Sequence, residues 1–250
     1  MLFEIALAVV AVLISIVGAY SLVVSVWLAT KYAKFNRREN SAGLTGEEVA
    51  RKILDDNGLQ NIAVKTTGSL MFGNSYSHFF KKVRLRRLTR HKTSLTSLGM
   101  GAQKASLAIL DKEGDPDMKK RIRLYPIITC GPFAFIPLIT IGLLIDYFLL
   151  NQNGIITFVL GGIGVLFYAY TLVLSVLTLK TEKKAQEKAY TILEETNLVT
   201  ADELDSLKEL FHLYNVQYIN DIILASLELL YFILKILVML QGNSSSADNK

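Results

Sequence analysis

Apolar residues along this chain gather in four long runs, separated by strongly polar segments. The first run, Ile5–Thr30, holds 26 residues and no formal charge, whereas a helix that crosses a bilayer needs about 20 apolar residues. The second run, Leu124–Leu150, contains three prolines and carries Asp146 near its end. The third run, Ile155–Leu179, follows the polar turn 151–154, so the two runs predict a helical hairpin. This pattern predicts a mainly α-helical, polytopic membrane protein.

The fourth run, Tyr218–Leu240, is the most polar of the four. It holds Asp221, Glu228 and Lys235, which recur at intervals of seven residues and therefore lie along one side of the predicted helix. Ionisable residues in a spanning helix face the bundle interior or water, and they often mark an ion path. The run predicts a fourth span, an amphipathic helix that lies on the membrane surface, or a helix packed in the membrane bundle. Its polar stripe is typical of a small transporter or of a contact between subunits.

Positive charge is concentrated between these runs. The segment 31–123 holds 20 Lys or Arg against 9 Asp or Glu, and four more lysines follow soon after residue 179. Because basic loops remain in the cytoplasm, we expect 31–123 and 180–217 to be cytoplasmic. The predicted parts are a first span in 1–30, a basic α+β domain in 31–123, a spanning hairpin in 124–179 (124–150 and 155–179), amphipathic helices in 180–217, a spanning or membrane-packed helix in 218–240 and a disordered tail in 241–250.

The basic domain carries clear local signals of secondary structure. Thr45–Glu48 has the spacing of a capping box, which starts a helix that Asn57-Gly58 ends. Residues 61–66 and 77–88 predict strands or a hairpin. The apolar stretch Leu95–Leu110 has the length of a buried helix, interrupted by two polar residues. A second capping box lies at Thr200–Glu203 in the other polar segment.

Composition excludes several classes of protein. Hydrophobic residues make up 51% of the chain and charged residues 20%, which argues against a disulfide scaffold, a disordered chain or an ordinary cytosolic enzyme. The one cysteine, Cys130, lies in a predicted span. The three histidines, His78, His91 and His212, include no pair at the four-residue spacing that binds zinc on a helix. The residues alone indicate no active site, metal or cofactor.

Residues 43–54, which follow the first predicted span, read Gly-Leu-Thr-Gly-Glu-Glu-Val-Ala-Arg-Lys-Ile-Leu. This stretch resembles the opening of a known family after its first span, the YugP-like bacterial membrane zinc metallopeptidases. The order of the later secondary-structure elements is also similar to that of the family: a strand at Val83–Leu85, a buried helix, a spanning hairpin, a helix at Ala189–Glu195 and a terminal apolar helix. The resemblance covers nearly the whole chain, and it implies a zincin-like domain with three to four spans in a bacterial plasma membrane.

The same resemblance implies that the catalytic motif is lost. In the family, the buried helix carries His-Glu-x-x-His, with two zinc ligands and a glutamate as general base. Gln103, Lys104 and Leu107 stand at those positions here, and Glu182 corresponds to the family's third ligand. Neither ligand position is an imidazole, and the Lys104 ammonium would repel Zn²⁺. We therefore expect a pseudoprotease without a cofactor, whereas assignment by family alone implies an active zinc metallopeptidase.

The densest basic run is the remaining feature with a candidate role. It indicates a solvated face, a site for anionic lipid headgroups at about 1 kcal/mol per cation, or a site for an acidic protein. The run has no interleaved aromatics, which argues against nucleic acid. Its cations are Lys81, Lys82, Arg84, Arg86, Arg87, Arg90 and Lys92. The leading hypothesis is an inactive structural or regulatory subunit that binds a membrane-protein partner or a second copy of itself.

Overall fold

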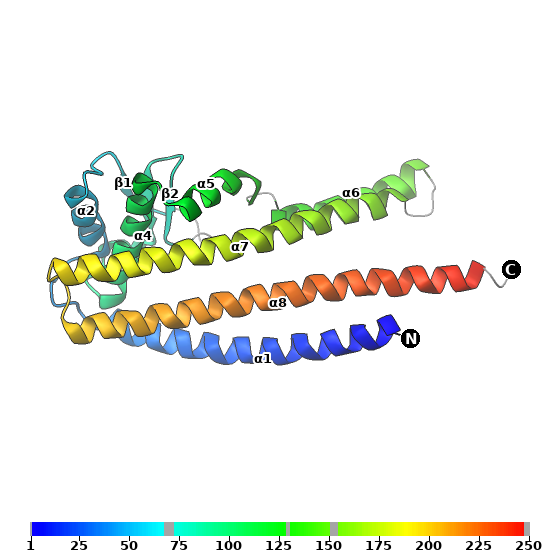
Figure 1. Ribbon diagram of the computed structural model, residues 1–250, viewed down its shortest axis with the longest axis horizontal. Helices are drawn as coiled ribbons and strands as arrows, with labels where there is room; N and C mark the ends of the chain where they lie inside the picture. The colour runs from blue at the N-terminus through cyan, green and yellow to red at the C-terminus, as the bar shows by residue number, and fades with distance from the viewer. Residues whose placement is uncertain (1, 68–72, 129–130, 151–154, 248–250) are drawn as a thin grey trace. The chain divides into compact units, whose positions relative to one another are not determined.

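The computed structural model describes residues 2–67, 73–128, 131–150 and 155–247 (Figure 1). The chain forms two compact units, which we describe separately. The helical unit comprises Met1–Val23, Leu124–Val176 and Tyr218–Lys250, and the mixed unit comprises Val24–Arg123 and Leu177–Gln217. Four helices contribute residues to both units: α1 (Leu2–Arg37), α5 (Pro116–Ile128), α7 (Ile155–Glu195) and α8 (Ala201–Ala247). The predicted mainly helical architecture with a small sheet is confirmed.

In the helical unit, α6 (Gly131–Ile145) leads into a π-helical turn, η1 (Asp146–Leu150), that contacts the start of α7. The Asp146 carboxylate accepts hydrogen bonds from the backbone nitrogens of Ile156, at 3.1 Å, and Thr157, at 2.7 Å. A carboxylate at this place satisfies backbone donors that a helix leaves unpaired at its N-terminus. The acid near the end of an apolar run thus has a local structural role.

Two helices in the described part of the chain are long and apolar enough to cross a membrane, α1 and α7. The predicted second run is divided, because its first residues belong to α5 (Pro116–Ile128) and α6 has only 15 residues. The spans predicted from the second and fourth runs, 124–150 and 218–240, therefore stay predictions. Cys130 and the turn 151–154 lie outside the described residues.

Both C-terminal helices are longer than expected. The predicted span 155–179 and the charged helix that follows it are one helix, α7, and the segment from 201 onward is likewise one helix, α8. No Gly or Pro interrupts α8 between residues 201 and 240, so nothing in the backbone ends it there. The helix continues to Ala247, whereas we expected a disordered tail from residue 241.

The core of the mixed unit is built around α4 (Leu95–Glu113). Every residue from Leu95 to Leu110 is buried, so the predicted buried helix is confirmed. Helix α2 (Gly46–Asp56) crosses it where two glycines meet, since a Cβ at Gly101 would lie 2.3 Å from the Gly46 carbonyl oxygen. The capping box is also confirmed: the Glu48 carboxylate accepts from the Thr45 nitrogen at 2.8 Å, and the Thr45 hydroxyl accepts from the Glu48 nitrogen at 3.2 Å.

A three-stranded sheet packs on this core, in the order β1-β3-β2. Strand β3 (Lys82–Leu85) pairs in parallel with β1 (Ala63–Thr66) and antiparallel with β2 (Ser75–Ser77). Both predicted segments, 61–66 and 77–88, therefore contain strands, but the alternative that they form a hairpin is wrong because β1 and β3 pair in parallel. The later segment holds the end of β2, a turn, β3 and the start of α3 (Arg87–His91), so it contains two strands where one was expected.

Successive side chains of β3 point alternately toward the core and away from it. Val83 and Leu85 are fully buried against the core, whereas Lys82 and Arg84 are half-buried on the opposite face of the strand. The sheet thus leaves one charged face away from the core of the mixed unit.

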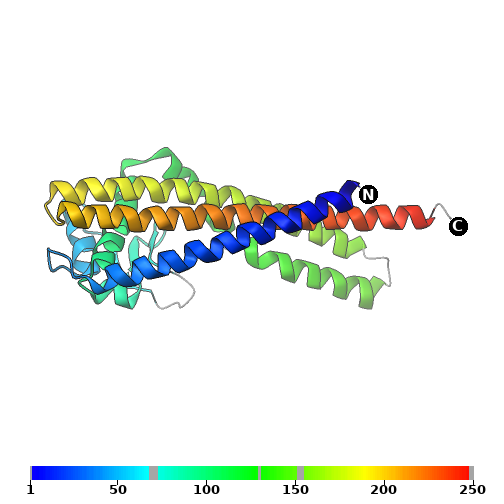
Figure 2. The same ribbon diagram turned by 90° about the horizontal axis from the view of Figure 1, so that it is seen from below.

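Within the mixed unit, the yellow part of α7 and the orange part of α8 lie side by side (Figure 2). Reciprocal hydrogen bonds between the side-chain amides of Gln186 and Asn215, at 2.7 and 3.1 Å, join the two helices.

Candidate functional site

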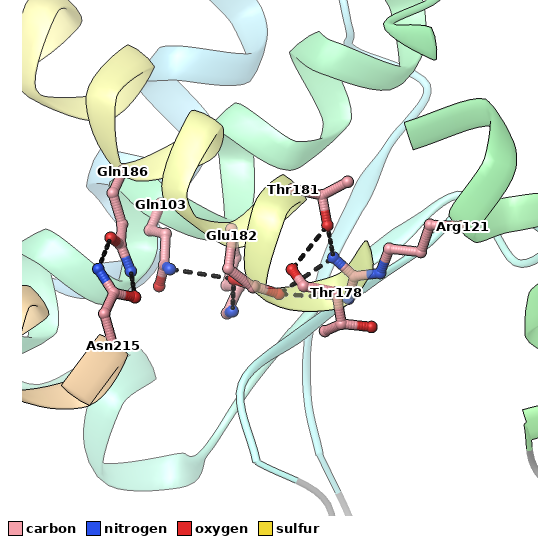
Figure 3. Close-up of polar contacts among 8 residues, drawn as sticks. Gln103, Arg121, Thr178, Thr181, Glu182, Gln186 and Asn215 are labelled. Carbon is pink, nitrogen blue, oxygen red and sulfur yellow. Dashed lines mark hydrogen bonds and ion pairs between the residues drawn. The ribbon is translucent and has the colours of Figure 1, made fainter. Parts of the chain in front are cut away.

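The candidate site centres on the Glu182 carboxylate, which α7 directs toward α4 (Figure 3). The Lys104 ammonium donates to Glu182 Oε2 at 2.7 Å, and the Gln103 amide donates to the same oxygen at 3.0 Å. The structure therefore brings Gln103 and Lys104, two of the suggested motif positions, to Glu182, the suggested surviving ligand. Gln103 and Lys104 precede Glu182 by 79 and 78 residues in the chain.

A second cation, Arg121 of α5, completes this cluster. Both terminal nitrogens of its guanidinium lie 3.2 Å from Glu182 Oε1, and one of them also donates to the Thr181 hydroxyl at 2.7 Å. That hydroxyl in turn donates to the carbonyl of Thr178 at 2.9 Å. The sequence did not predict a role for Arg121, because it is one of several basic residues around α5 and no spacing relates it to α4 or α7.

Burial makes this cluster energetically important. The side chains of Lys104, Arg121 and Glu182 are 10%, 15% and 17% exposed. Burial alone would raise the pKa of Glu182, but the two neighbouring cations outweigh it, so the pKa lies below its ordinary value. Glu182 is therefore a carboxylate at neutral pH, and its negative charge offsets one of the two buried positive charges.

Leu107, the third suggested position, is not part of the polar cluster. Its side chain is 1% exposed and packs in a separate apolar cluster with Leu110, Met118 and Ala185. It contributes packing between α4, α5 and α7 instead of a ligand. The side chain that would face a metal from this position is thus aliphatic and enclosed by other aliphatic groups.

Comparison with known proteins identifies the family. The family described as "Putative neutral zinc metallopeptidase" matches residues 8–237. The chain belongs to this family. It is 23% identical over 205 residues to the "Putative membrane protease YugP" of Bacillus subtilis (strain 168), an alignment that covers 82% of this chain and 86% of the relative. No solved structure matches the chain significantly. The family resemblance that residues 43–54 indicated is confirmed.

The residues at this site do not fit the zinc ion that the name of the metallopeptidase family implies. Zinc in proteins is held by thiolate, imidazole or carboxylate groups, and this cluster offers one carboxylate, whose oxygens already accept from three side chains. An ammonium has no lone pair to donate. Within residues 2–67, 73–128, 131–150 and 155–247, no group of three or more His, Cys, Asp or Glu side chains is placed to hold a metal ion.

The densest basic run of this zinc metallopeptidase homologue does not act as one surface. Arg90 is held by Glu47 through two hydrogen bonds, at 2.7 and 2.5 Å, and the Lys92 ammonium donates to the Asn36 carbonyl at 2.6 Å. Both cations therefore stabilise the fold. The other five suggested cations have no carboxylate partner among the described residues: Lys81, Lys82, Arg84, Arg86 and Arg87.

A second polar cluster, which sequence analysis missed, joins the sheet to α4. The Tyr76 hydroxyl donates to Asp111 Oδ2 at 2.6 Å, and His78 Nδ1 lies 2.6 Å from the same oxygen. Burial, and then the hydrogen bond to this carboxylate, raise the pKa of Tyr76. Tyr76 and His78 lie 35 and 33 residues before Asp111, so no local sequence motif predicts these contacts.

The suggested polar stripe lies in the helical unit. Asp221, Glu228 and Lys235 are all on α8 and all exposed. The structure places them at regular intervals along one helix, as the sequence predicted. Their suggested role in an ion path stays a prediction.

Proposed function

We propose that this family member is a catalytically inactive pseudoprotease that serves as a structural or regulatory subunit of a membrane protein complex. The observation that carries the proposal is the Lys104 ammonium, 2.7 Å from the Glu182 carboxylate. The family resemblance assigns Lys104 to the place of the general base and Gln103 and Leu107 to the places of two zinc ligands. None of these three side chains can perform the corresponding role.

The electrostatics of the cluster support this proposal. In an active site of this kind, a divalent cation neutralises the buried acidic ligand. Here Lys104 and Arg121 already surround Glu182 with two positive charges. A zinc ion at this carboxylate would be placed beside two buried cations, and like charges at such distances in a partly buried site repel strongly. The chain thus has its own cations where the family has a metal.

Metal content of the purified full-length protein tests the inactive part of the proposal. After exposure to zinc and dialysis, we expect the wild-type protein to retain far less than one zinc per chain by mass spectrometry. The variant Q103H/K104E/L107H restores the ligand and base types and removes one cation from Glu182. We expect it to retain substantially more zinc than the wild type under identical handling.

Two outcomes would contradict the proposal. Stoichiometric zinc in the wild-type protein, together with zinc-dependent cleavage of an unfolded protein substrate, would show an active peptidase with a different ligand set. Cleavage by wild type that a chelator abolishes would do the same. A matched variant, Lys52→Glu, changes a lysine to an acid on the exposed side of α2 and controls for the change of charge in the triple variant.

The subunit part of the proposal rests on α1. Small residues recur along this helix, including Ala8, Ser15 and Gly18, and such faces allow close helix packing in membranes. Among the described residues, no atom outside its own stretch of helix lies within 4 Å of where a Gly18 Cβ would be. In mild detergent, we expect the protein mass of the wild-type particle, without its bound detergent, to exceed that of one 27.9 kDa chain. We expect Gly18→Leu to reduce this protein mass. A monomeric wild-type protein would contradict this part.

We further propose three to four spans in a bacterial plasma membrane, a zincin-like mixed unit in the cytoplasm, and no cofactor. The excess of basic residues in 31–123 supports this orientation, and α1 and α7 supply two of the spans. Four spans put the C-terminus outside the cytoplasm, and three put it inside. A C-terminal fluorescent protein that folds only in the cytoplasm distinguishes these arrangements.

A further inference from the structure

An aromatic pair is exposed at the tip of the sheet in the mixed unit. Phe79 and Phe80 lie in the turn between β2 and β3, and their side chains are 58% and 66% exposed. Large apolar side chains in a soluble unit are normally buried, and isolated exceptions need no explanation. Here two adjacent phenylalanines in one turn are both more than half exposed, so they are not isolated exceptions.

The turn that carries these rings is tightly built. The Lys81 nitrogen donates to the His78 carbonyl at 3.3 Å, and Lys81 itself has a φ of 47°. A positive φ is uncommon outside glycine and marks a tight turn. His78, at the base of the turn, contacts Asp111 of the buried helix α4 at 2.6 Å. The Phe pair is therefore presented on a short turn that is anchored to the core.

Two cations lie beside the Phe80 ring. The Lys82 ammonium lies 4.6 Å from the centre of the Phe80 ring, and the Arg84 guanidinium lies 5.4 Å from it. Lys65 of β1 stands opposite Arg84 across the parallel pair, so the solvent face of the sheet carries several positive charges. Among the described residues, no carboxylate forms an ion pair with these cations. The tip is thus apolar, and its border is basic.

We propose that this turn, residues 78–84, docks the mixed unit on a bilayer surface that contains anionic lipids. Phe79 and Phe80 enter the headgroup region, and Lys81, Lys82 and Arg84 contact lipid phosphates. Apolar insertion combined with Lys and Arg at the interface is the pattern of interfacial membrane anchors. Helices α1 and α7 are candidate membrane spans and also contribute residues to the mixed unit, so the chain itself connects this unit to any bilayer that those helices cross. This proposal does not depend on whether the protein has peptidase activity.

A single-tryptophan reporter tests the docking. Trp27 is the chain's one tryptophan, so the variant Trp27→Phe with Phe80→Trp places the fluorophore in the turn. The full-length variant is reconstituted in vesicles of zwitterionic lipid with and without phosphatidylglycerol, each containing brominated lipid as quencher. We expect blue-shifted emission and quenching at residue 80 in the anionic vesicles, with a smaller effect in zwitterionic vesicles and in high salt.

Charge removal then identifies the surface. In the reporter background, we expect K81Q/K82Q/R84Q to shift the docking equilibrium about fivefold for each charge removed. The matched variant K52Q/K183Q/K208Q removes the same charge from exposed positions elsewhere in the mixed unit, and it should leave quenching unchanged. A second reporter, Asp205→Trp with Trp27→Phe, samples a side chain that is 78% exposed and should be quenched in neither vesicle.

Three results would overturn the proposal. Equal quenching in the two vesicle types would show that anionic lipid is not recognised. Red-shifted, unquenched emission at residue 80 in anionic vesicles would show that the turn stays in water. Emission that shifts only when membrane proteins from the native source are added would assign the turn to a protein partner instead. Far-ultraviolet circular dichroism of every variant establishes that the fold is retained.

Discussion

Lysine and arginine are used in opposite ways in two regions of the mixed unit. Lys104 and Arg121 are nearly buried, and both bind the Glu182 carboxylate between α4, α5 and α7. Lys82 and Arg84, in contrast, lie on the face of β3 opposite the core, beside an exposed phenylalanine. Buried cations that share a carboxylate are held inside the fold, whereas surface cations without a carboxylate partner are available to a ligand. The following substitutions test this division.

The largest effect is expected at the carboxylate shared by the buried cations. Glu182→Gln preserves the shape of the side chain but leaves Lys104 and Arg121 buried without a counter-charge. Because removal of one member of a buried ion pair leaves a charge uncompensated, we expect a loss of about 3–5 kcal/mol in the free energy of unfolding. Chemical denaturation in detergent, followed by circular dichroism, measures it.

Glu187→Gln provides the matched control, because Glu187 is on the same helix and exposed. We expect it to change the free energy of unfolding by less than about 0.5 kcal/mol. If the two substitutions had equal effects, the cluster around Glu182 would not be a buried ion network, and the proposed replacement of a metal by internal cations would lose its support.

Sequence alone predicted the components of this network better than their connections. The buried helix, the capping box at Thr45 and the family were all correctly predicted, because they depend on local spacing or on an extended sequence match. Arg121 was missed, because its contact with Glu182 joins residues 61 positions apart. The bonds from Tyr76 and His78 to Asp111 were missed for the same reason.

The basic run shows a second limit of sequence reasoning. Its seven cations look equivalent in the sequence, but Arg90 belongs to an ion pair with Glu47 of α2, and Lys92 binds a backbone carbonyl of α1. Only the folded arrangement of α2 and α3 distinguishes them from Lys82 and Arg84. The parallel pairing of β1 with β3 was also inaccessible, since strand order depends on how the chain crosses the core.

The same substitution, lysine to methionine, can be made in the buried cluster and on the sheet. Lys104→Met removes a charged hydrogen bond to Glu182, which retains Arg121, so we expect a loss of about 1.5–3 kcal/mol in the free energy of unfolding. Lys82→Met removes the same group from a surface position and should change stability by less than about 0.5 kcal/mol. The two variants are compared by denaturation under identical detergent conditions.

The reverse order of effects would contradict the division. If Lys82→Met destabilised the protein more than Lys104→Met, the outer face of the sheet would be part of the folded core, and the proposed membrane contact would lack a free surface. Arg87→Met, at an exposed position in α3, tests whether the loss of any cation from the basic run has an effect of its own.

Acid provides the smallest and most specific test of the buried region. The pKa of Glu182 lies below its ordinary value of 4.5, so the unfolded chain binds the proton more readily than the folded chain. The stabilisation from this carboxylate is complete above pH 4.5 and is lost as the pH falls toward the folded pKa. The wild-type protein should therefore lose up to about 1.4 kcal/mol per pH unit in that range through this group.

Measuring wild type and Glu182→Gln in parallel isolates that contribution. The pKa values of Asp115, Asp117 and Glu203 are also lowered by their partners. These groups titrate in both proteins, so their contributions cancel in the difference between the two free energies of unfolding. We expect the stability gap between the two proteins to narrow as the pH falls below 4.5. A constant gap would mean that Glu182 is not held ionised by Lys104 and Arg121, and the buried cluster would then be no more a charge network than the surface of the sheet.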